Sequence, residues 1–512
     1  MKGYLCEMKY ILACIYIFLS ILAHGQYSFQ WDDRIQQIND AVTSMRIPEA
    51  KRLIQSERKI HPKNLCLDLL ESHADLYELF FNESKEVFKT AYPMFSARIE
   101  KFEKAPQNSP YRDYGLGVLY LSKAAVAIRF EKNLEAAWAF RKAYFYFKDN
   151  KKNFPQFSPN DVYYGLLTTL LGSVPNNYQW LLNIIGMPGD INRGIALVHK
   201  YIHSRDANNK VARNVAMLVY PYLVVIFEGN KNKALAFLEK ADYDYKYNHL
   251  HAYMATNLYL GNQQAKRSLE IAEGIVKSDA YSEVAFWHFE KGYGLLNQLK
   301  FDQSEKEFLQ FVDQFKGSFY LKDAYEKLSW IAYLRGDQKK ASEYRSQVLQ
   351  RGSLVTDADK MSMRNAQSAT WPHPLLLRAR LLSDGGMFKE SIEVFKGMST
   401  DDFQSAADKA EFVYRLARNY DLIGDKELAI KYYNAAIAFG SNVRDYFAAR
   451  SALQTALIYE ERKDYVKASY YFKTAISMKD YPFKNSIDQK AKSGVYRSSM
   501  ASTAVNGKKL TD

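Results

Sequence analysis

The hydrophobic pattern is most regular between residues 411 and 436, where apolar positions recur at the spacing of an α-helix. Small and apolar side chains form that face on both sides of Gly424, namely Leu416, Ala417, Tyr420, Ala429, Tyr433 and Ala436. Gly424 lies where a residue with left-handed backbone commonly ends a helix. The small residues allow two helices to approach closely, and the aromatic residues fill the space beside them. The stretch therefore predicts a pair of antiparallel helices.

Imperfect copies of this helix pair recur along most of the chain. Ala468 follows Ala429 by 39 residues, and Ser391 precedes it by 38. Other copies contain Ala456, Tyr459, Phe472 and Ala475; Ala379, Leu382 and Phe395; Gly292, Leu295, Ser304 and Phe308; and Ala124, Ala136, Phe140 and Ala143. Such repetition is typical of the tetratricopeptide repeat, a helix pair of about 34 residues. The predicted fold is all-α, an α-solenoid of tetratricopeptide-type antiparallel helix pairs.

The repeat pattern is interrupted in two places. Residues 352–374 lengthen one interval between matching small positions to 50 residues, which predicts an inserted loop or a short extra helix. Residues 174–202 predict a kink, in which a short apolar helix at 180–185 leads into a turn. Asp190 is suited to cap the helix that follows this turn.

These interruptions suggest five regions. They are a signal peptide at 1–25, N-terminal helical repeats at 26–155, a central helical region with the kink at 156–275, a C-terminal tetratricopeptide array with the insertion at 276–490, and a flexible tail at 491–512. The tail is rich in Ser, Ala, Lys and Gly and lacks an apolar face, which is why we expect it to be flexible.

The kink resembles a segment of the tetratricopeptide repeat protein 39 family, which includes the fungal inclusion-body clearance proteins. In that family a helix with a Leu-Leu pair leads into a Gly-Phe-x-Gly-Asp/Asn-x-x-x-Gly-Leu turn and helix. The matching residues are Pro175, Leu181, Leu182, Gly186, Gly189, Asp190 and Gly194, whereas Met187 replaces the aromatic residue and Ile195 the leucine. The order of elements from about residue 110 to 480 is also similar. The resemblance implies the family's architecture, and the Tyr, Lys and Asn usage suggests an exported, Bacteroidetes-like bacterial relative.

The N-terminus has the pattern of an export signal. Lys2 and Lys9 precede an apolar run at residues 10–22, and Ala23-His24-Gly25 supplies the small residues of a cleavage site. The run is shorter than the roughly 20 residues of a membrane-spanning helix. The alternative is lipidation at Cys14, although this residue lies inside the apolar run. We expect the mature chain to have no transmembrane span and to lie in the periplasm or peripherally on the cell envelope.

Charge and chemistry-bearing residues add few constraints. The net charge is +13, but Lys and Arg are interspersed with Asp and Glu, which favours a solvated surface over nucleic-acid binding. A preference for anionic partners is the alternative. His199 and His203 share a helix face, but the Glu of a zinc-protease motif and a third ligand are missing. Cys66 has no obvious base partner. We therefore expect no catalytic residues, metal or cofactor.

The predicted function rests on the first helix of each pair. In tetratricopeptide arrays, positions 2, 5, 9 and 12 of these helices line a concave groove. The expected binding residues are Phe286, Phe289, Tyr293, Trp330, Tyr333, Arg380, Tyr414 and Arg418. Because Tyr, Trp and Arg supply many interface hot spots, we expect a non-enzymatic scaffold that binds protein or peptide partners in this groove. The alternatives are a carrier of a lipid or glycan between helix stacks, and an enzyme with a site at the kink.

Overall fold

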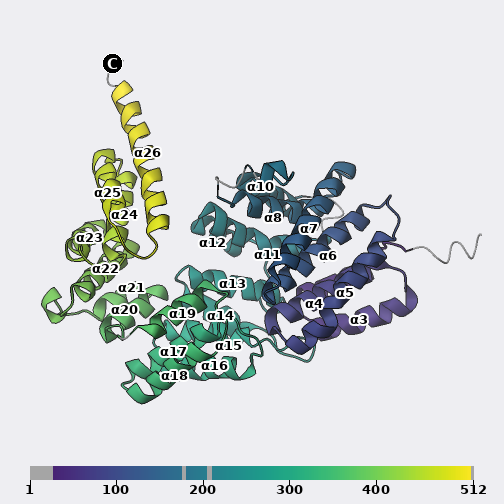
Figure 1. The fold of residues 1–512 in the computed structure, drawn as a ribbon, viewed down its shortest axis with the longest axis horizontal. Coiled ribbons are helices and arrows are strands. Elements are labelled where there is room, and N and C mark those ends of the chain that lie inside the picture. The colour runs from purple at the N-terminus through teal and green to yellow at the C-terminus, as the bar shows by residue number, and fades with distance from the viewer. Residues whose placement is uncertain (1–26, 176–179, 181, 205–209, 369, 509–512) are drawn as a thin grey trace, which may run out of the picture.

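The computed structural model describes residues 27–175, 180, 182–204, 210–368 and 370–508. Within these residues the chain forms helices and no β-strand, and an isolated bridge joins Ser28 to Asn64. Figure 1 shows the helices stacked one after another along an elongated molecule. The chain is an all-α solenoid, as the repeat pattern predicts.

The helices follow one another with short connections. The N-terminal ones are α2 (Asp33–Thr43), α3 (Ile47–Ile60), α4 (Leu65–Asn82), α5 (Lys85–Glu103), α6 (Pro110–Arg129), α7 (Asn133–Asn153) and α8 (Asn160–Gly172). The central ones are α10 (Ile191–Ile202), α11 (Arg213–Leu223), the π-helix η2 (Val224–Glu228), α12 (Lys231–Lys240), α13 (His249–Gly261) and α14 (Ala265–Gly274).

The C-terminal half continues the same arrangement. Its helices are α15 (Phe286–Leu296), α16 (Phe301–Gln314), α17 (Leu321–Leu334), α18 (Gln338–Gln350), α19 (Asp357–Gln367), α20 (Pro374–Asp384), α21 (Phe388–Glu393), the 3-10 helix η3 (Thr400–Asp402), α22 (Ala406–Ile423), α23 (Lys426–Gly440), α24 (Phe447–Glu461), α25 (Tyr465–Ser477) and α26 (Lys484–Lys508). None of the helices in the described residues combines the length and hydrophobicity needed to cross a bilayer.

The pair α22 and α23 is the clearest repeat. Gly424 ends α22 with a left-handed φ of 93°, and the Asp425 side chain caps α23 by accepting a hydrogen bond from the Leu428 amide at 3.1 Å. Ala417, Ala429 and Tyr433 are fully buried where the two helices meet, as the sequence pattern predicts. The equivalent small residues of the next pair, α24 and α25, are also buried, namely Ala456, Ala468 and Ala475.

The C-terminal segment is helical as far as Lys508, whereas the sequence pattern predicts a flexible tail at 491–512. α26 packs on α25, with Ile487 and Ala491 buried. Gly494 lies directly over the ring of Phe472, where a larger side chain would overlap the ring. The sequence pattern did not reveal this helix because its buried positions are small and widely spaced, which gives a weak apolar face.

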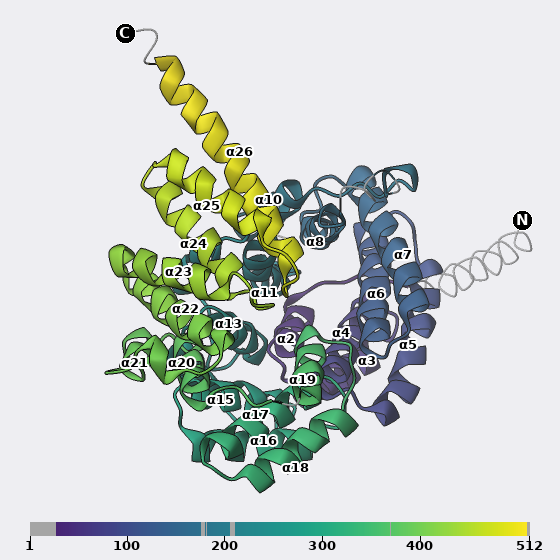
Figure 2. The same ribbon diagram turned by 60° about the vertical axis from the view of Figure 1, so that its left-hand side comes forward.

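The N-terminal helices pack against the middle of the chain. Figure 2 shows the helices winding around a common centre. A single hydrophobic cluster contains residues of α2 to α4 together with residues of α13 to α17. The rings of Phe81 and Tyr253 meet edge to face at 5.0 Å, and the Ser318 hydroxyl donates to Glu83 at 2.8 Å. The inner face of the solenoid is therefore partly filled by the chain itself.

The glycines of the kink allow two helices to cross unusually closely. A Cβ atom on Gly165 of α8 would lie 2.6 Å from the carbonyl oxygen of Gly194 on α10, so neither position tolerates a side chain. Gly186 has a left-handed φ of 74°, and Asp190 caps α10 by accepting from the Arg193 amide at 2.9 Å. The expected short helix at 180–185 includes Leu181, which lies outside the described residues, as do residues 176–179.

The insertion at 352–374 contains the extra helix α19, which packs across α17. Asp359 accepts hydrogen bonds from the amides of Tyr320 at 2.8 Å and Asp323 at 3.3 Å at the start of α17. The Asn365 side chain donates to Glu326 at 2.7 Å. This helix thus covers two α17 residues, Asp323 and Glu326, at positions expected to line a concave groove.

Candidate functional site

Three adjoining hollows form the candidate binding site. The apolar hollow, about 500 Å³, is lined by Leu76, Tyr77, Phe80, Phe81, Ala125, Arg129, Leu218, Val219, Tyr222, Leu250, Tyr253, Asn257, Phe286 and Tyr320. The central hollow, about 570 Å³, is lined mainly by Lys231, Asn257, Phe289, Glu290, Tyr293, Tyr320, Asp323, Lys327, Trp330, Arg380, Asp384 and Arg418. The polar hollow, about 370 Å³, is lined mainly by Glu326, Ser329, Trp330, Arg345, Asn365, Trp371, Arg380, Asp408, Glu411 and Asp445.

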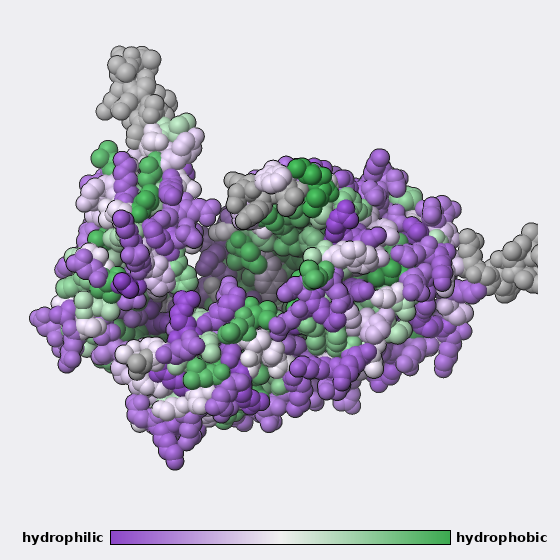
Figure 3. All heavy atoms as spheres, in the orientation of Figure 1, coloured by the Kyte–Doolittle hydropathy of each residue, from purple (hydrophilic) through white to green (hydrophobic). Residues whose placement is uncertain are grey.

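The three hollows adjoin one another through shared wall residues. Asn257 and Tyr320 line both the apolar and the central hollow, while Trp330 and Arg380 line both the central and the polar hollow. From α13 onward their walls come mainly from the first helices of pairs, α13, α15, α17, α20 and α22, which is the inner face of the solenoid. Figure 3 shows the surface hollowed between the C-terminal stack and the central helices, with hydrophobic residues gathered beside the hollow.

Six of the eight predicted binding residues contribute to these hollows. Phe286 lines the apolar hollow, and the central hollow is lined by Phe289, Tyr293, Trp330, Arg380 and Arg418. Tyr333 lines none of the three hollows, because its ring stacks on Trp371 of the insertion at 4.7 Å. Tyr414 also lines none of them and packs against the ring of Phe447 at 5.2 Å.

Two of the predicted binding residues, Phe286 and Phe289, are largely covered by neighbouring side chains. Phe286 is 3% exposed and Phe289 is 7% exposed, because the rings of Phe311 and Tyr320 lie against both of them. The hollows are left where such aromatic packing is incomplete.

Arg129 is a buried cation in the wall of the apolar hollow. Its guanidinium lies over the rings of Phe319 at 4.0 Å and Phe80 at 5.0 Å. Its one ion pair, among the described residues, is with Glu83 at 3.6 Å, and its buried Nε atom has no hydrogen-bond partner. Burial lowers the pKa of Arg129 from its usual range, and the Glu83 carboxylate opposes this shift.

Glu290 is a buried acid in the wall of the central hollow. It is 2% exposed, and its Oε1 atom accepts a long hydrogen bond of 3.4 Å from the Asn257 side chain. Its Oε2 atom has no partner. Burial raises the pKa of Glu290 to about 7, while the hydrogen bond from Asn257 lowers it slightly. Sequence reasoning missed both Arg129 and Glu290, although each is a charge set among apolar residues of a helix.

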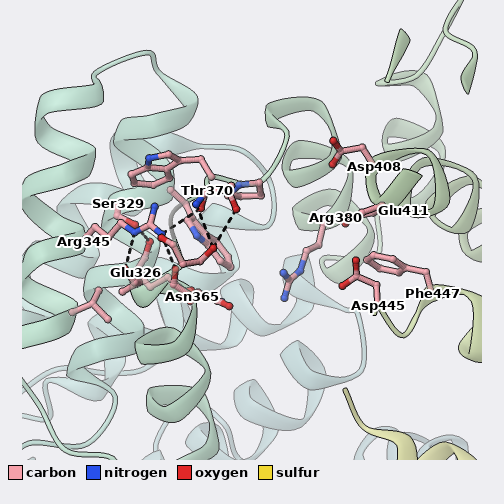
Figure 4. Close-up of a pocket in the computed structure, with 17 residues that line it drawn as sticks. Glu326, Ser329, Arg345, Asn365, Thr370, Arg380, Asp408, Glu411, Asp445 and Phe447 are labelled. Carbon is pink, nitrogen blue, oxygen red and sulfur yellow. Dashed lines mark hydrogen bonds between the residues drawn. The ribbon is translucent and has the colours of Figure 1, made fainter. Parts of the chain in front are cut away.

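The polar hollow lies between the insertion and α22. Figure 4 shows Arg345 on one side, Asp408, Glu411 and Asp445 on the other, and Arg380 between them. Arg345 donates to the backbone carbonyls of Asn365 at 2.8 Å, Ala366 at 3.1 Å and Thr370 at 3.3 Å. This arginine therefore fastens the insertion to α18.

The two histidine pairs and Cys66 differ in burial. His199 and His203 are exposed and their rings lie 4.3 Å apart, whereas His249 and His251 are buried, with ring nitrogens 2.8 and 3.0 Å from backbone carbonyl oxygens. Cys66 is buried, and burial raises its pKa, which keeps it a thiol. In the described part of the chain, no group of three or more His, Cys, Asp or Glu side chains could hold a metal ion.

The chain has distant likenesses among solved structures. No curated protein sequence matches the chain. The chain is similar to the solved TPR domain of P58(IPK), with 12% identity over 86% of this chain and 99% of that one, and a TM-score of 0.21. It is also similar to a chain of the structure of Naa15/Naa10 bound to HypK-THB, with 14% identity over 91% of this chain and 66% of that one, and a TM-score of 0.24. These scores are too low to inform the function.

The family model of Iml2/Tetratricopeptide repeat protein 39 matches residues 88–366. The match covers more than half of the chain. It includes the close crossing of α8 and α10, the helices α13 and α15 that line the central and apolar hollows, and most of the insertion helix α19. The chain belongs to the Iml2/Tetratricopeptide repeat protein 39 family.

Proposed function

We propose that this protein is a non-enzymatic scaffold that binds a segment of a protein partner along its inner face, in the three adjoining hollows. The observation that carries the proposal is that neighbouring hollows share wall residues and lie mainly on the first helices of the repeats. Tetratricopeptide-type families and folds are typically non-catalytic scaffolds that take part in protein–protein interactions. We assign no reaction to the chain.

The chemistry of the hollows favours a protein segment as the occupant. Their walls change from apolar, around Leu76 and Leu218, to charged, around Arg380 and Asp384. A polypeptide can present apolar and charged side chains in succession along one surface, whereas a small molecule rarely matches such a long and varied wall. Trp330 and Arg380, at the junction of two hollows, belong to the residue types that often dominate binding energy.

A lipid or glycan carrier is the second candidate function. The observation in its favour is the apolar hollow of about 500 Å³, a size typical of small-ligand sites. An enzyme with a site at the kink has less support, because the glycines there serve the close crossing of α8 and α10.

The proposal is tested by selecting peptides from a displayed random library against the purified chain. Peptides that bind are then compared on the wild type and two variants. Leu218→Trp fills the apolar hollow, whereas Leu134→Trp adds the same ring at a position that is 89% exposed on the second helix of its pair. We expect the first variant to weaken binding about ten-fold or more and the second to leave it unchanged. Failure to select any peptide, or equal binding by both variants, contradicts the proposal.

We also infer that the chain is an exported bacterial member of its family, with residues 1–25 as the signal. The support is the order of Lys2 and Lys9, the apolar run and the small residues up to Gly25, all of which lie outside the described residues. Fusion of residues 1–30 to a reporter enzyme that is active only after export tests this inference. We expect the wild-type fusion to be active and the Ile15→Asp fusion, in which the apolar run is interrupted, to be inactive. An inactive wild-type fusion contradicts the inference.

A further inference from the structure

Two buried charges of opposite sign face the same pair of tyrosines at the boundary between the apolar and central hollows. Arg129 and Glu290 each interact electrostatically with Tyr253 and Tyr320, yet no ion pair joins the two charges to each other. Arg129 comes from α6 and Glu290 from α15, so they reach the boundary from opposite walls. A buried charge that lacks hydrogen-bond partners raises the free energy of the folded chain. A ligand that supplies those hydrogen bonds would therefore bind favourably at these two residues.

Arg129 has more donors than the protein satisfies. A guanidinium carries five N–H donors, but within the described residues the buried Nε of Arg129 has no partner, and its Nη2 atom lies 3.6 Å from Glu83, beyond hydrogen-bond distance. Both oxygens of its neighbour Glu83 already accept hydrogen bonds, from the Ser318 hydroxyl at 2.8 Å and the Phe319 amide at 3.3 Å. A carboxylate brought into the apolar hollow would find an unoccupied guanidinium edge there.

Glu290 has more acceptor capacity than the protein satisfies. Its only hydrogen bond in the described residues is the long one from Asn257, and Oε2 is free. Of the cations in the central hollow, Lys327 pairs with Asp323 at 2.9 Å, Arg380 with Asp384 at 3.5 Å and Arg418 with Asp421 at 3.1 Å. Lys231 also lines this hollow, and no ion pair within the described residues joins it to Glu290. A basic group brought into the central hollow would find an unpaired carboxyl oxygen.

We propose that the partner segment carries a bulky apolar residue beside an acidic residue at the apolar hollow, with the acid against Arg129, and a basic residue against Glu290 at the central hollow. This inference rests on the proposed function and deepens it, because it names the partner's chemistry. The two charges also set the direction of the segment, since a reversed segment would bring like charges together at both positions.

Binding at Glu290 is coupled to protonation. A basic group favours the ionised carboxylate, so the segment binds more tightly as the pH rises from 6 through the pKa of about 7 to pH 8. The other titratable groups that face Glu290 are Tyr222, Tyr253 and Tyr320, whose pKa values burial raises further above this range. The charged side chains across the central hollow are Lys231, Asp323, Lys327, Arg380, Asp384 and Arg418. The Glu290→Gln variant separates the contribution of Glu290 from theirs.

The test uses the peptides selected from the displayed library. We expect them to share an acidic and a basic residue in a fixed order, with a bulky apolar residue beside the acid. Replacing the acid by its amide should weaken binding to the wild type about ten-fold, but should have no effect on Arg129→Gln. Replacing the base by a neutral residue should likewise weaken binding to the wild type and have no effect on Glu290→Gln. In that variant the gain in affinity from pH 6 to 8 should disappear.

Matched controls are Lys306→Gln and Glu343→Gln, which remove exposed charges outside the hollows. The peptide substitutions are measured on the wild-type chain, so the test stands even if Arg129→Gln does not fold. Selected peptides without the ordered charges, or peptides equally sensitive in wild type and variants, overturn this inference and leave the scaffold proposal standing. A library that yields no binding peptide overturns the scaffold proposal and this inference with it.

Discussion

At the scale of residues, close packing of small side chains decides where helices cross. Gly165 and Gly194 bring the backbones of α8 and α10 into contact, and Gly292 lies against the ring of Phe308 in a regular repeat. The first crossing has no room for a Cβ atom, whereas in the second a ring could shift. Gly194, one of the residues by which the kink resembles its family, is therefore explained by packing.

Replacing Gly194 by Val should destabilise the chain by about 2 to 4 kcal/mol, because the added methyl groups overlap the backbone of α8. Urea unfolding followed by circular dichroism measures the loss. The control is Gly274→Ala at the end of α14, where a Cβ atom would meet nothing within 4 Å, and its effect should stay within about 1 kcal/mol. Equal effects of the two substitutions would contradict the packing account.

Acid should destabilise the fold through its buried histidines. Burial lowers the pKa values of His73, His249 and His251 to about 4, whereas the unfolded value is 6.5. The unfolded chain therefore binds more protons, and the stability present above pH 6.5 is lost as the pH falls towards 4, by up to about 3 kcal/mol for each histidine. Melting temperatures between pH 4 and 8 measure this slope, which His73→Phe should make shallower. An unchanged slope in that variant would count against the assignment.

The repeat register predicted many buried residues but not the two charges of the site. Ala417, Ala429 and Tyr433 follow from local spacing, since their burial depends on one helix pair. Arg129 and Glu290 acquire their surroundings from helices far apart in the chain, which no local pattern reveals. The sequence feature that marks Arg129 and Glu290 is a charge on an otherwise apolar helix face. Lys327 has the same feature, but it forms an ordinary buried ion pair with Asp323.

At the scale of elements, the insertion helix α19 occupies part of the inner face. It covers Asp323 and Glu326 of α17, and the following residues bring Trp371 onto Tyr333. Sequence reasoning located the insertion and allowed for a short helix, but it did not predict that this helix lies on the expected groove. Such docking depends on hydrogen bonds between segments separated by some 40 residues, for example that from Asn365 to Glu326.

Arg345→Ala should loosen α19 without unfolding the array. The substitution removes hydrogen bonds to the carbonyls of Asn365 and Ala366, and the cation–π contact with Trp371 at 4.5 Å. We expect amide hydrogens of residues 357–367 to exchange about ten-fold faster, while those of α22 keep their rates. Lys360→Ala, on the exposed side of α19, is the control and should change neither. Unchanged exchange in Arg345→Ala would show that other contacts hold the helix.

At the scale of the whole molecule, the solenoid closes on itself. α2 to α4 pack against α13 to α17, which fills part of the inner face and leaves the three hollows. The sequence predicted the fold class and the inner helices. It could not predict this closure, because contacts such as that between Asn214 and Thr43, at 2.7 Å, join residues 171 positions apart.

The most direct measurement of the central claim is site-specific photo-crosslinking in cells that produce the chain. A benzophenone amino acid is placed at Phe80 or Lys231, which line the hollows, or at Leu134 or Val466, which are exposed on second helices. The account predicts a discrete protein adduct from the two inner positions and none from the two outer positions. Adducts formed only from the outer positions, or equally from all four, would contradict binding along the inner face.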